Sequence, residues 1–481
     1  MNYRIVTSIL GRILAIEAGL LLVPMAVAGW YREDALPFLW TILLSLAAAW
    51  LLLVIGRKPG RGLRPREGFV SVTLSWVVIS LFGALPFVFS KTIPNYISAL
   101  FEIISGFTTT GASVLTEIES LPKGILFWRS FSHFVGGMGV LVFMMAILPT
   151  DDEHSMHLLR AEVPGPVKGK LMPRMRGTAR TLYIIYLVMT IAQVVLLLCG
   201  GMGLFDALTT AFGTAGTGGF SVRNASIGAY NSAYIEMVTA VFMLLFGVNF
   251  NLYYIVLIKR SVKGFKSQEL ALYLLVVAAS TVTIALNIAH QYSGILEAFR
   301  HSFFQVSSIV TTTGFATADF NLWPSYSRAL LVLLMLMGAC AGSTGGGTKV
   351  ARLVILGKAV WGEIRRLLSP RSVGRITLDG ERLEDTAIHN TMVYYMLYIL
   401  AALAAFLLLT IEGMDLETTF TSVISCLSNI GPGLNLVGPT GNFSVWSGPS
   451  KLLLSLCMLL GRLEIFPVLT LFISGVWSRR P

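Results

Sequence analysis

Four short segments, each ending a polar run in Thr-Gly or its equivalent, recur along this chain at nearly even spacing. They are TTTGAS at 108–113, TAGTGGFS at 214–221, TTTGFAT at 311–317 and SNIGPG at 428–433. The intervals are 107, 96 and 117 residues when counted between the glycines that we align, which are Gly111, Gly218, Gly314 and Gly431. Repetition at this length indicates a duplicated domain, because the repeats of solenoid proteins are shorter, at about 20 to 50 residues. Four Gly-containing loops, three of them lined with Thr, predict a pore walled by backbone carbonyls.

The composition is that of a membrane protein. Of 481 residues, 55% are hydrophobic and 13% are charged, and the mean hydropathy is +0.74. A bilayer crossing needs roughly 20 apolar residues, and uncharged stretches near that length include 36–55, 181–200 and 392–411. The leading stretch, 5–30, has no small-residue cleavage site, so we expect a retained helix rather than a signal peptide.

Basic residues cluster in alternate loops. Four loops are rich in Lys and Arg, at 57–66, 160–180, 259–266 and 365–382, whereas the loops between them carry scattered cations such as Arg32, Lys123 and Arg223. This bias predicts that both termini are cytoplasmic. Topology thus explains the net charge of +11. Contact of these basic loops with membrane lipid or with a cytosolic partner is a secondary role. Nucleic acid is not an expected partner.

Two other features are expected to carry no chemistry. The four cysteines, Cys199, Cys340, Cys426 and Cys457, lie singly without metal or redox spacing, which predicts reduced packing residues. The segment DDEHSMH at 151–157 is a possible metal-binding sequence, but a polar loop after a helix end is the favoured interpretation.

The apolar runs and the charge pattern predict an all-α membrane protein with ten full crossings and four re-entrant loops around one central pore. Two helices form an N-terminal extension at 1–67. Each of four tandem repeats then has an outward helix, a short pore helix, a Gly loop and a returning helix. We place the repeats at 68–150, 151–258, 259–358 and 359–481, with a connector opening the second.

The four predicted pore helices are too short to span a bilayer. They cover 95–108, 204–215, 296–312 and 415–429, and each mixes apolar residues with Ser or Thr. The chain beyond each must turn back within the membrane, where nonhelical backbone is tolerated only if protein buries it or water bathes it. Amphipathic helices at the membrane surface are the alternative. Four matching positions favour the re-entrant interpretation.

The loops suit a dehydrated monovalent cation. An ion that lost its water uncompensated would face roughly tens of kcal/mol of desolvation, and carbonyl oxygens replace that water without a fixed charge. Gly permits the required backbone geometry, and Thr hydroxyls add oxygens. The four loops contain no Asp or Glu, which disfavours a divalent filter built on carboxylates.

These loops and the two leading helices resemble the Trk/Ktr/HKT superfamily of potassium transporters, in particular its TrkH-like branch, over essentially the whole chain. The resemblance implies potassium as the transported ion. Family members with Ser at the first filter position tend to favour sodium, and Gly111 stands there in this chain. The implied filter residues are Thr109, Thr110, Gly111, Thr217, Gly218, Thr312, Thr313, Gly314, Asn429, Ile430 and Gly431.

The fourth loop departs most from the others. Asn429 and Ile430 replace Thr residues, Pro432 stiffens the next turn, and none of the loops contains TVGYG. A heterogeneous ring should discriminate less sharply, so some passage of rubidium, caesium or sodium is expected.

A Gly-rich run lies within the returning helix of the third repeat. Five of the ten residues at 338–347 are glycine, and at up to about 1 kcal/mol each they should break a helix. Close helix packing through small residues is one alternative. A nucleotide loop is another, but GSTGGGTK at 342–349 lacks the Gly-Lys-Ser/Thr order. The resemblance implies an intramembrane gate comprising Gly338, Gly342, Gly345, Gly346, Gly347 and Lys349.

Arg462 lies near the middle of the last apolar stretch, where an unpaired cation costs at least about 2.5 kcal/mol. Glu464 is on a different helical face, which makes local pairing doubtful. An ion pair with another helix is one interpretation, and the resemblance implies instead a gate residue beneath the filter. Arg129, His133 and Glu236 are expected to be structural, in buried pairs or lining the outer vestibule.

The sequence thus predicts a potassium channel gated by the Gly-rich loop and Arg462. A symporter coupled to Na+ or H+ is the alternative, although such transporters usually have two repeats, often inverted. An enzyme would need a convergent polar cluster, and none stands out among six histidines. No catalytic residue or bound cofactor is therefore expected.

The resemblance also implies an assembly. It predicts a homodimer with one pore per protomer in the cell inner (cytoplasmic) membrane, regulated by a TrkA-like cytosolic nucleotide-binding subunit. The connector at 159–176 is a candidate contact for that subunit.

Overall fold

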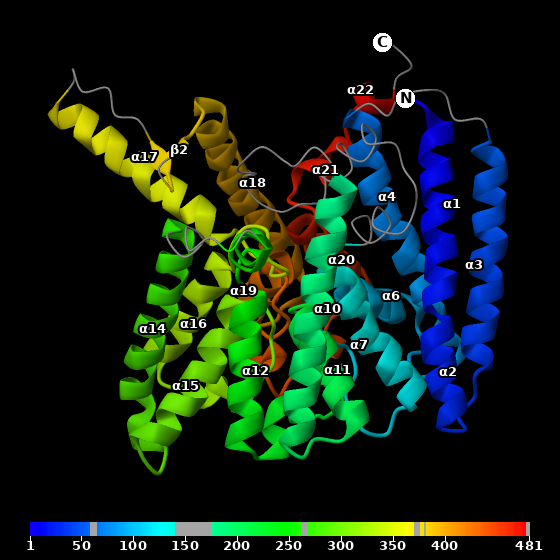
Figure 1. Cartoon of the computed structure of the whole chain (residues 1–481), viewed down its shortest axis with the longest axis horizontal. Coiled ribbons are helices and arrows are strands. Elements are labelled where there is room, and N and C mark those ends of the chain that lie inside the picture. The colour runs from blue at the N-terminus through cyan, green and yellow to red at the C-terminus, as the bar shows by residue number, and fades with distance from the viewer. Residues whose placement is uncertain are drawn as a thin grey trace.

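The structure is a computed structural model in which helices account for nearly every regular element (Figure 1). The described residues are 1–57, 65–139, 175–258, 260, 267–369, 376–379 and 381–477. The acidic segment 151–157 and most of the connector at 159–176 lie outside them. One small antiparallel hairpin joins β1 (Thr377–Leu378) to β2 (Glu381–Arg382), with Thr377 opposite Arg382.

Within the described residues, six helical spans are long and apolar enough to cross a membrane. They correspond to the two leading helices and to the first helix of each repeat, as the hydropathy predicts. Their elements are α1 (Tyr3–Leu20) with α2 (Leu22–Trp30), α3 (Leu36–Ile55), α4 (Pro65–Gly83) with α5 (Leu85–Phe89), α10 (Met175–Cys199), α14 (Gln268–Ile288) and α18 (Asp385–Leu409).

The returning helices differ from the continuous crossings that the sequence predicts. In the second repeat, α12 (Ala233–Phe246) bends by 90° into the helix that begins with α13 (Phe250–Tyr253). In the fourth, α20 (Gly448–Arg462) and α21 (Phe466–Thr470) are separated by a break. Glu464 and Ile465 have φ values of 59° and 62° there, which a helix cannot contain.

The third returning helix breaks where the glycine run predicts a break. α16 (Ser325–Met337) ends there, and α17 (Val350–Leu368) starts only after the loop 338–349. α7 (Lys123–Gly137) is the returning helix of the first repeat. Short 3₁₀ turns occupy Ser226–Tyr230, Ala289–Gln291, Phe320–Leu322, Thr410–Glu412, Asn435–Val437 and Phe443–Val445, a π turn occupies Tyr254–Ile258, and the last helix is α22 (Ser474–Trp477).

Four short helices lie where the sequence predicts pore helices, with bounds that agree to within two residues. They are α6 (Tyr96–Phe107), α11 (Leu204–Ala215), α15 (Ile295–Val310) and α19 (Leu416–Ser428). The side chain of Asn95 accepts hydrogen bonds from two backbone amides at the start of α6, and Asp415 accepts one at the start of α19. Such N-caps satisfy donors that have no partner within the helix.

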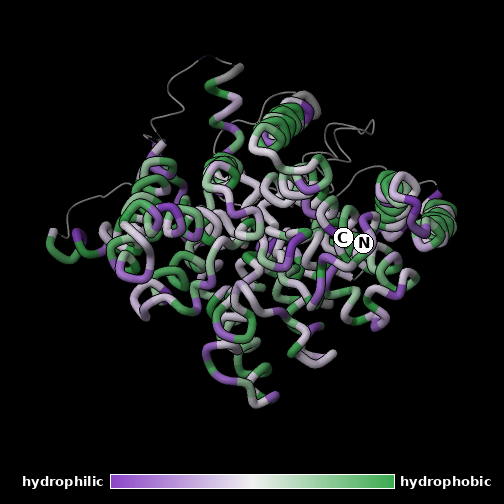
Figure 2. The backbone as a smooth tube through the Cα atoms, turned by 90° about the horizontal axis from the view of Figure 1, so that it is seen from below, coloured by the Kyte–Doolittle hydropathy of each residue, from purple (hydrophilic) through white to green (hydrophobic). Residues whose placement is uncertain are grey.

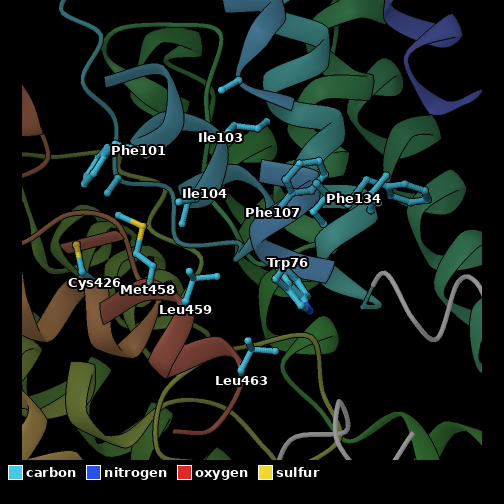
Figure 3. Packing of buried hydrophobic residues seen from close by; sticks show 14 of the residues in the cluster. Trp76, Phe101, Ile103, Ile104, Phe107, Phe134, Cys426, Met458, Leu459 and Leu463 are labelled. Atoms are coloured by element: carbon cyan, nitrogen blue, oxygen red, sulfur yellow. The ribbon is translucent and has the colours of Figure 1, made fainter. Parts of the chain in front are cut away.

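The fourth repeat packs against the first and so closes the bundle. Figure 3 shows Phe101 and Ile104 of α6 facing Met458 and Leu459 of α20, and all four side chains are buried. They belong to one continuous apolar cluster that also includes residues of the N-terminal extension. The chain therefore forms one ring of repeats rather than a row.

The two ends of the chain meet on one face of the molecule, as Figures 1 and 2 show from two directions. The hydroxyl of Tyr3 donates a hydrogen bond to the carbonyl of Trp477 over 2.9 Å. Whichever side of the membrane this face occupies, both termini share it.

Replacing Phe107 by Ala should strongly destabilise the protein. Phe107 is 1% exposed and meets Trp128 edge to face at 5.8 Å, and truncation of a buried Phe costs about 3 to 5 kcal/mol. Thermal unfolding of the purified protein in detergent measures the loss. Phe472→Ala, at a position 73% exposed, is the matched control. Equal melting temperatures for the two variants would contradict the packing role.

Candidate ion-permeation site

A residue with left-handed backbone follows each pore helix by one or two positions. The φ values are 55° at Thr109, 54° at Thr217, 58° at Thr312 and 56° at Asn429. The amide of the following residue then bonds to the carbonyl five positions back, for example Thr110 N to Ser105 O at 2.8 Å, which is a Schellman-type helix end. Gly or Asn usually occupies this position, and a non-Gly residue there costs about 1 to 3 kcal/mol. Strain at equivalent places in four repeats indicates a functional constraint.

A left-handed glycine lies two residues after each of these positions. The φ values are 81° at Gly111, 74° at Gly219, 85° at Gly314 and 102° at Gly431. The equivalent glycine in the second repeat is therefore Gly219, one residue beyond the Gly218 that the sequence alignment selects. The sequence offers two adjacent glycines there, and only backbone geometry distinguishes them. We call the segments 109–111, 217–219, 312–314 and 429–431 the filter triplets.

The four filter triplets form a closed ring. A Cβ atom added to Gly111 would collide with the carbonyl oxygen of Gly218, and one on Gly219 would collide with that of Thr313. The same holds for Gly314 against Ile430. A Cβ atom on Gly431 would lie 2.7 Å from the carbonyl oxygen of Thr110, which returns to the first triplet. Each triplet's glycine thus faces the middle carbonyl of the next triplet.

The middle carbonyls are available to a cation. Among the described residues, the carbonyl oxygens of Thr110, Gly218, Thr313 and Ile430 accept no hydrogen bond. A buried carbonyl without a partner is costly, and a dehydrated cation is one partner that a ring of such carbonyls can accept. The hydroxyl of Thr109 is likewise buried without a hydrogen bond. The carboxyl ends of four pore helices add partial negative charge at the same place.

Hydroxyl and amide groups brace the triplets. Thr108 and Thr110 share a hydroxyl hydrogen bond of 2.8 Å, and Thr311 and Thr313 share the equivalent bond of 2.7 Å. The side-chain amide of Asn429 donates to the hydroxyl of Thr110 at 2.9 Å and so ties the fourth triplet to the first. The departure of the fourth loop from Thr therefore adds a cross-link between repeats.

A buried ion pair supports the first two loops. Glu102 of α6 accepts from Arg129 Nε at 2.6 Å and from the amide of Val114 at 2.8 Å, and Arg129 donates to the carbonyl of Ser221 at 2.8 Å. The structural role predicted for Arg129 is confirmed. The role of Glu102 was not predicted from the sequence, although Glu102 is the single charged residue in the α6 segment.

Two further structural predictions are confirmed. His133 joins its Nδ1 to the carbonyl of Gly106 at 2.7 Å and accepts from the amide of Phe220 at 3.2 Å. A neutral ring protonated at Nδ1 satisfies both bonds. Glu236 pairs with Arg300 at 3.0 Å.

The Gly-rich segment 338–349, which we call the intramembrane loop, touches the filter triplets. The amide of Gly346 donates to the hydroxyl of Thr312 over 2.6 Å. A Cβ atom on Gly345 would lie 3.0 Å from the carbonyl oxygen of Thr311, and one on Gly346 would lie 2.5 Å from that of Ser428. Gly338, Gly342 and Gly347 all have positive φ. The glycines therefore permit both the turns of the loop and its close approach.

Arg462 and Lys349 converge on the same loop. Arg462 donates to the carbonyl of Thr344 at 2.9 Å and to those of Gly136 and Gly137, at the end of α7, at 2.5 and 3.0 Å. Lys349 donates to the carbonyl of Gly345. A cation at a helix carboxyl end interacts favourably with its unpaired carbonyls.

Glu464 does not neutralise Arg462 locally, as the helical spacing predicts. It pairs with Arg352 of α17 at 2.5 Å. This pair links α17 to the break between α20 and α21.

These features define a multi-pass, all-α membrane protein in which four re-entrant loops surround one axis. Residues 38–479 match a family model described as TrkH, cation transport protein. The chain belongs to this family, and it is a transporter and not an enzyme.

Named relatives cover almost the whole chain. The Trk system potassium uptake protein TrkH of Escherichia coli K12 is 38% identical over 99% of this chain and 100% of its own length. The Trk system potassium uptake protein TrkI of Halomonas elongata is 32% identical over 98% of this chain and 96% of its own length. The crystal structure of the potassium transporter TrkH from Vibrio parahaemolyticus has a TM-score of 0.89 at 34% identity, covering 99% of this chain and 100% of that one.

Gly219→Ala should distort the ring and lower both ion uptake and selectivity for potassium over sodium, because its Cβ would collide with the carbonyl of Thr313. Gly201→Ala is the control, since Gly201 also has positive φ, 84°, but a Cβ there meets nothing within 4 Å. Both variants carry the backbone strain of Ala at positive φ, and only one carries the collision. Rubidium uptake into proteoliposomes distinguishes them. Equal uptake by both would argue against the ring.

Proposed function

We propose that this protein takes up potassium across the cell inner (cytoplasmic) membrane, through a filter of backbone carbonyls from the four triplets. The observation that carries the proposal is the closed ring, in which each middle carbonyl lacks a hydrogen bond within the described residues. The triplets contain no acidic side chain, which favours a monovalent ion. Relatives named as potassium uptake proteins support this ion.

We further propose that the intramembrane loop and Arg462 form the gate. The tip of the loop, residues 344–346, bonds to Thr312 of the filter through Gly346, and Arg462 donates to the carbonyl of Thr344 in the same tip. A fixed guanidinium next to the filter opposes the passage of cations by Coulomb repulsion, which is strong where water is scarce. Opening requires the loop tip to leave these partners.

Control of the gate is assigned to a TrkA-like cytosolic nucleotide-binding subunit. α17 runs from the intramembrane loop toward the face where both termini lie (Figure 1), and the positive-inside bias supports a cytoplasmic position for this face. A subunit bound there has a direct mechanical connection to the loop.

A homodimer is supported by the outward surface of α17. This helix projects from the bundle (Figure 1) and carries large apolar side chains on its surface. Leu367 is 82% exposed and Leu368 is 80% exposed. Val360, Trp361 and Ile364 are also exposed. The same helix carries Arg365 and Arg366 in its last turn, so a second copy of the chain is a better cover for this surface than lipid tails.

Rubidium flux in proteoliposomes tests the filter and gate together. Gly314→Ser should lower selectivity for potassium over sodium, because the added side chain would displace the carbonyl of Ile430. Arg462→Ala should raise flux without the partner about tenfold or more, since a hydrogen bond to a charged group contributes about 1.5 to 3 kcal/mol. A deletion within 338–347 should act in the same direction.

Flux with no applied sodium or proton gradient separates a channel from a coupled symporter, because a channel still conducts under those conditions. Unchanged selectivity in Gly314→Ser and unchanged flux in the other two variants would refute the proposed roles.

The double variant Trp361→Ser and Leu367→Ser should be monomeric. Both positions are on the exposed surface of α17, at 61% and 82%, and their burial supplies the free energy of association. Native mass spectrometry measures the oligomeric state. The matched control is Trp50→Ser with Leu286→Ser, at positions 68% and 67% exposed on other helices. A dimer that survives only in the control supports the interface, and one that survives in both contradicts it.

A further inference from the structure

A single buried carboxylate holds both ends of the intramembrane loop. Glu269, the second residue of α14, is 7% exposed. Its Oε1 accepts a hydrogen bond from the amide of Ala341 at 2.6 Å and another from the amide of Ala351 at 3.1 Å. These donors are ten positions apart and flank the loop tip that reaches the filter. The contacts to Thr312 and Arg462 hold the tip. Glu269 holds the neck, by which we mean residues 339–341 and 350–351, where the two sides of the loop come together.

The charge of Glu269 is well placed. It lies in the first turn of α14, and Ala351 lies in the first turn of α17. Two helix amino ends therefore present partial positive charge and unpaired amides to one carboxylate. The amide of Val350 also bonds to the carbonyl of Ala339 at 3.1 Å and closes the neck. Among the described residues, removing the carboxylate leaves this backbone bond and the bond from the hydroxyl of Thr348 to the carbonyl of Leu336, at 2.7 Å, across the neck.

The same end of α14 is tied to the hairpin that follows α17. Asp379, in the turn between β1 and β2, accepts from the amide of Gln268 at 2.7 Å. Lys358 of α17 bonds to the side chain of Gln268 at 2.5 Å and to the carbonyl of Thr377 at 2.6 Å. The amino end of α14, the helix α17 and the hairpin therefore form one unit on the side of the molecule that carries the termini.

We propose that Glu269 is a positioning residue for the gate, which clamps the neck of the intramembrane loop and so keeps its tip against the filter. The hairpin around Asp379 holds Glu269 in place and connects the clamp to the surface of the protein. The inference rests on the proposed function, because it takes residues 338–349 to be the gate. A loop released at its neck moves as a whole, and the closed state loses occupancy.

Rubidium uptake into proteoliposomes without a partner subunit tests the clamp. Glu269→Ala should raise uptake about tenfold, because a charge-assisted bond shifts a two-state equilibrium by at least about that factor. Glu269→Gln should raise it less, since the amide oxygen still accepts hydrogen bonds without the charge. Asp379→Ala should produce a smaller rise in the same direction. Glu363→Gln, on the exposed face of α17, removes the same charge and should leave uptake unchanged.

A second variant removes the donor and leaves the carboxylate intact. Ala351→Pro deletes one of the two amides, and proline is tolerated in the first turn of a helix. This chain itself has proline at the second position of α3, α5, α20 and α21. Rubidium uptake by the Ala351→Pro variant should rise, as expected for Glu269→Ala. If Glu269→Ala does not fold, Ala351→Pro tests the clamp in its place.

Cys340 reports on the loop directly. It is fully buried beside Ala341, whereas Cys199 is exposed. In a Cys199→Ser background, a water-soluble maleimide should label Cys340 faster in Glu269→Ala and Ala351→Pro than in the parent. Cys426 and Cys457, buried elsewhere, serve as internal controls, because general unfolding would expose them too.

The outcomes separate this inference from the proposed function. Arg462→Ala is the positive control for a released gate. If Arg462→Ala raises uptake while Glu269→Ala and Ala351→Pro change neither uptake nor labelling of Cys340, the clamp is refuted and the proposed function stands. If no variant conducts, Arg462→Ala and the parent included, the proposed function fails and this inference fails with it.

Discussion

The structure depends on the close approach of four backbone segments that leaves no room for a side chain. Each filter triplet places a glycine against the middle carbonyl of the next, and the fourth meets the first. A left-handed residue at the end of every pore helix turns the chain into this position. That backbone is strained where Thr carries it. The surrounding groups stabilise it, and Glu102, Arg129 and His133 bind the first and second loops from behind.

The intramembrane loop combines contacts of two kinds. Its tip depends on single hydrogen bonds to Thr312 and Arg462, which contribute a few kcal/mol at most when charge is involved. Its neck is held by Val350 and Glu269. The proposed gating role fits contacts of this size, because a switch requires two arrangements separated by a modest free energy.

The broken returning helices explain how irregular backbone survives inside a membrane. Every amide and carbonyl there needs a partner within the protein. The bend in the second repeat and the loop in the third repeat pair with each other. The amide of Cys340 bonds to the carbonyl of Gly247, and the amide of Phe250 bonds to the carbonyl of Gly342, both at 3.0 Å. Two breaks that would be costly singly therefore stabilise one another, and these bonds join the loop to the end of α12.

The sequence by itself determined the membrane class, the four repeats and the pore helices to within two residues. These properties depend on apolar length and composition, which are local. It also predicted the break at 338–347, since clustered glycines weaken any helix. Only the tertiary structure decided that Gly219 rather than Gly218 is the equivalent of Gly111, Gly314 and Gly431, that two other returning helices bend, and that Glu269 spans the loop neck. The sign of φ and the contacts between distant repeats arise when segments about a hundred residues apart pack together, and no single segment encodes them.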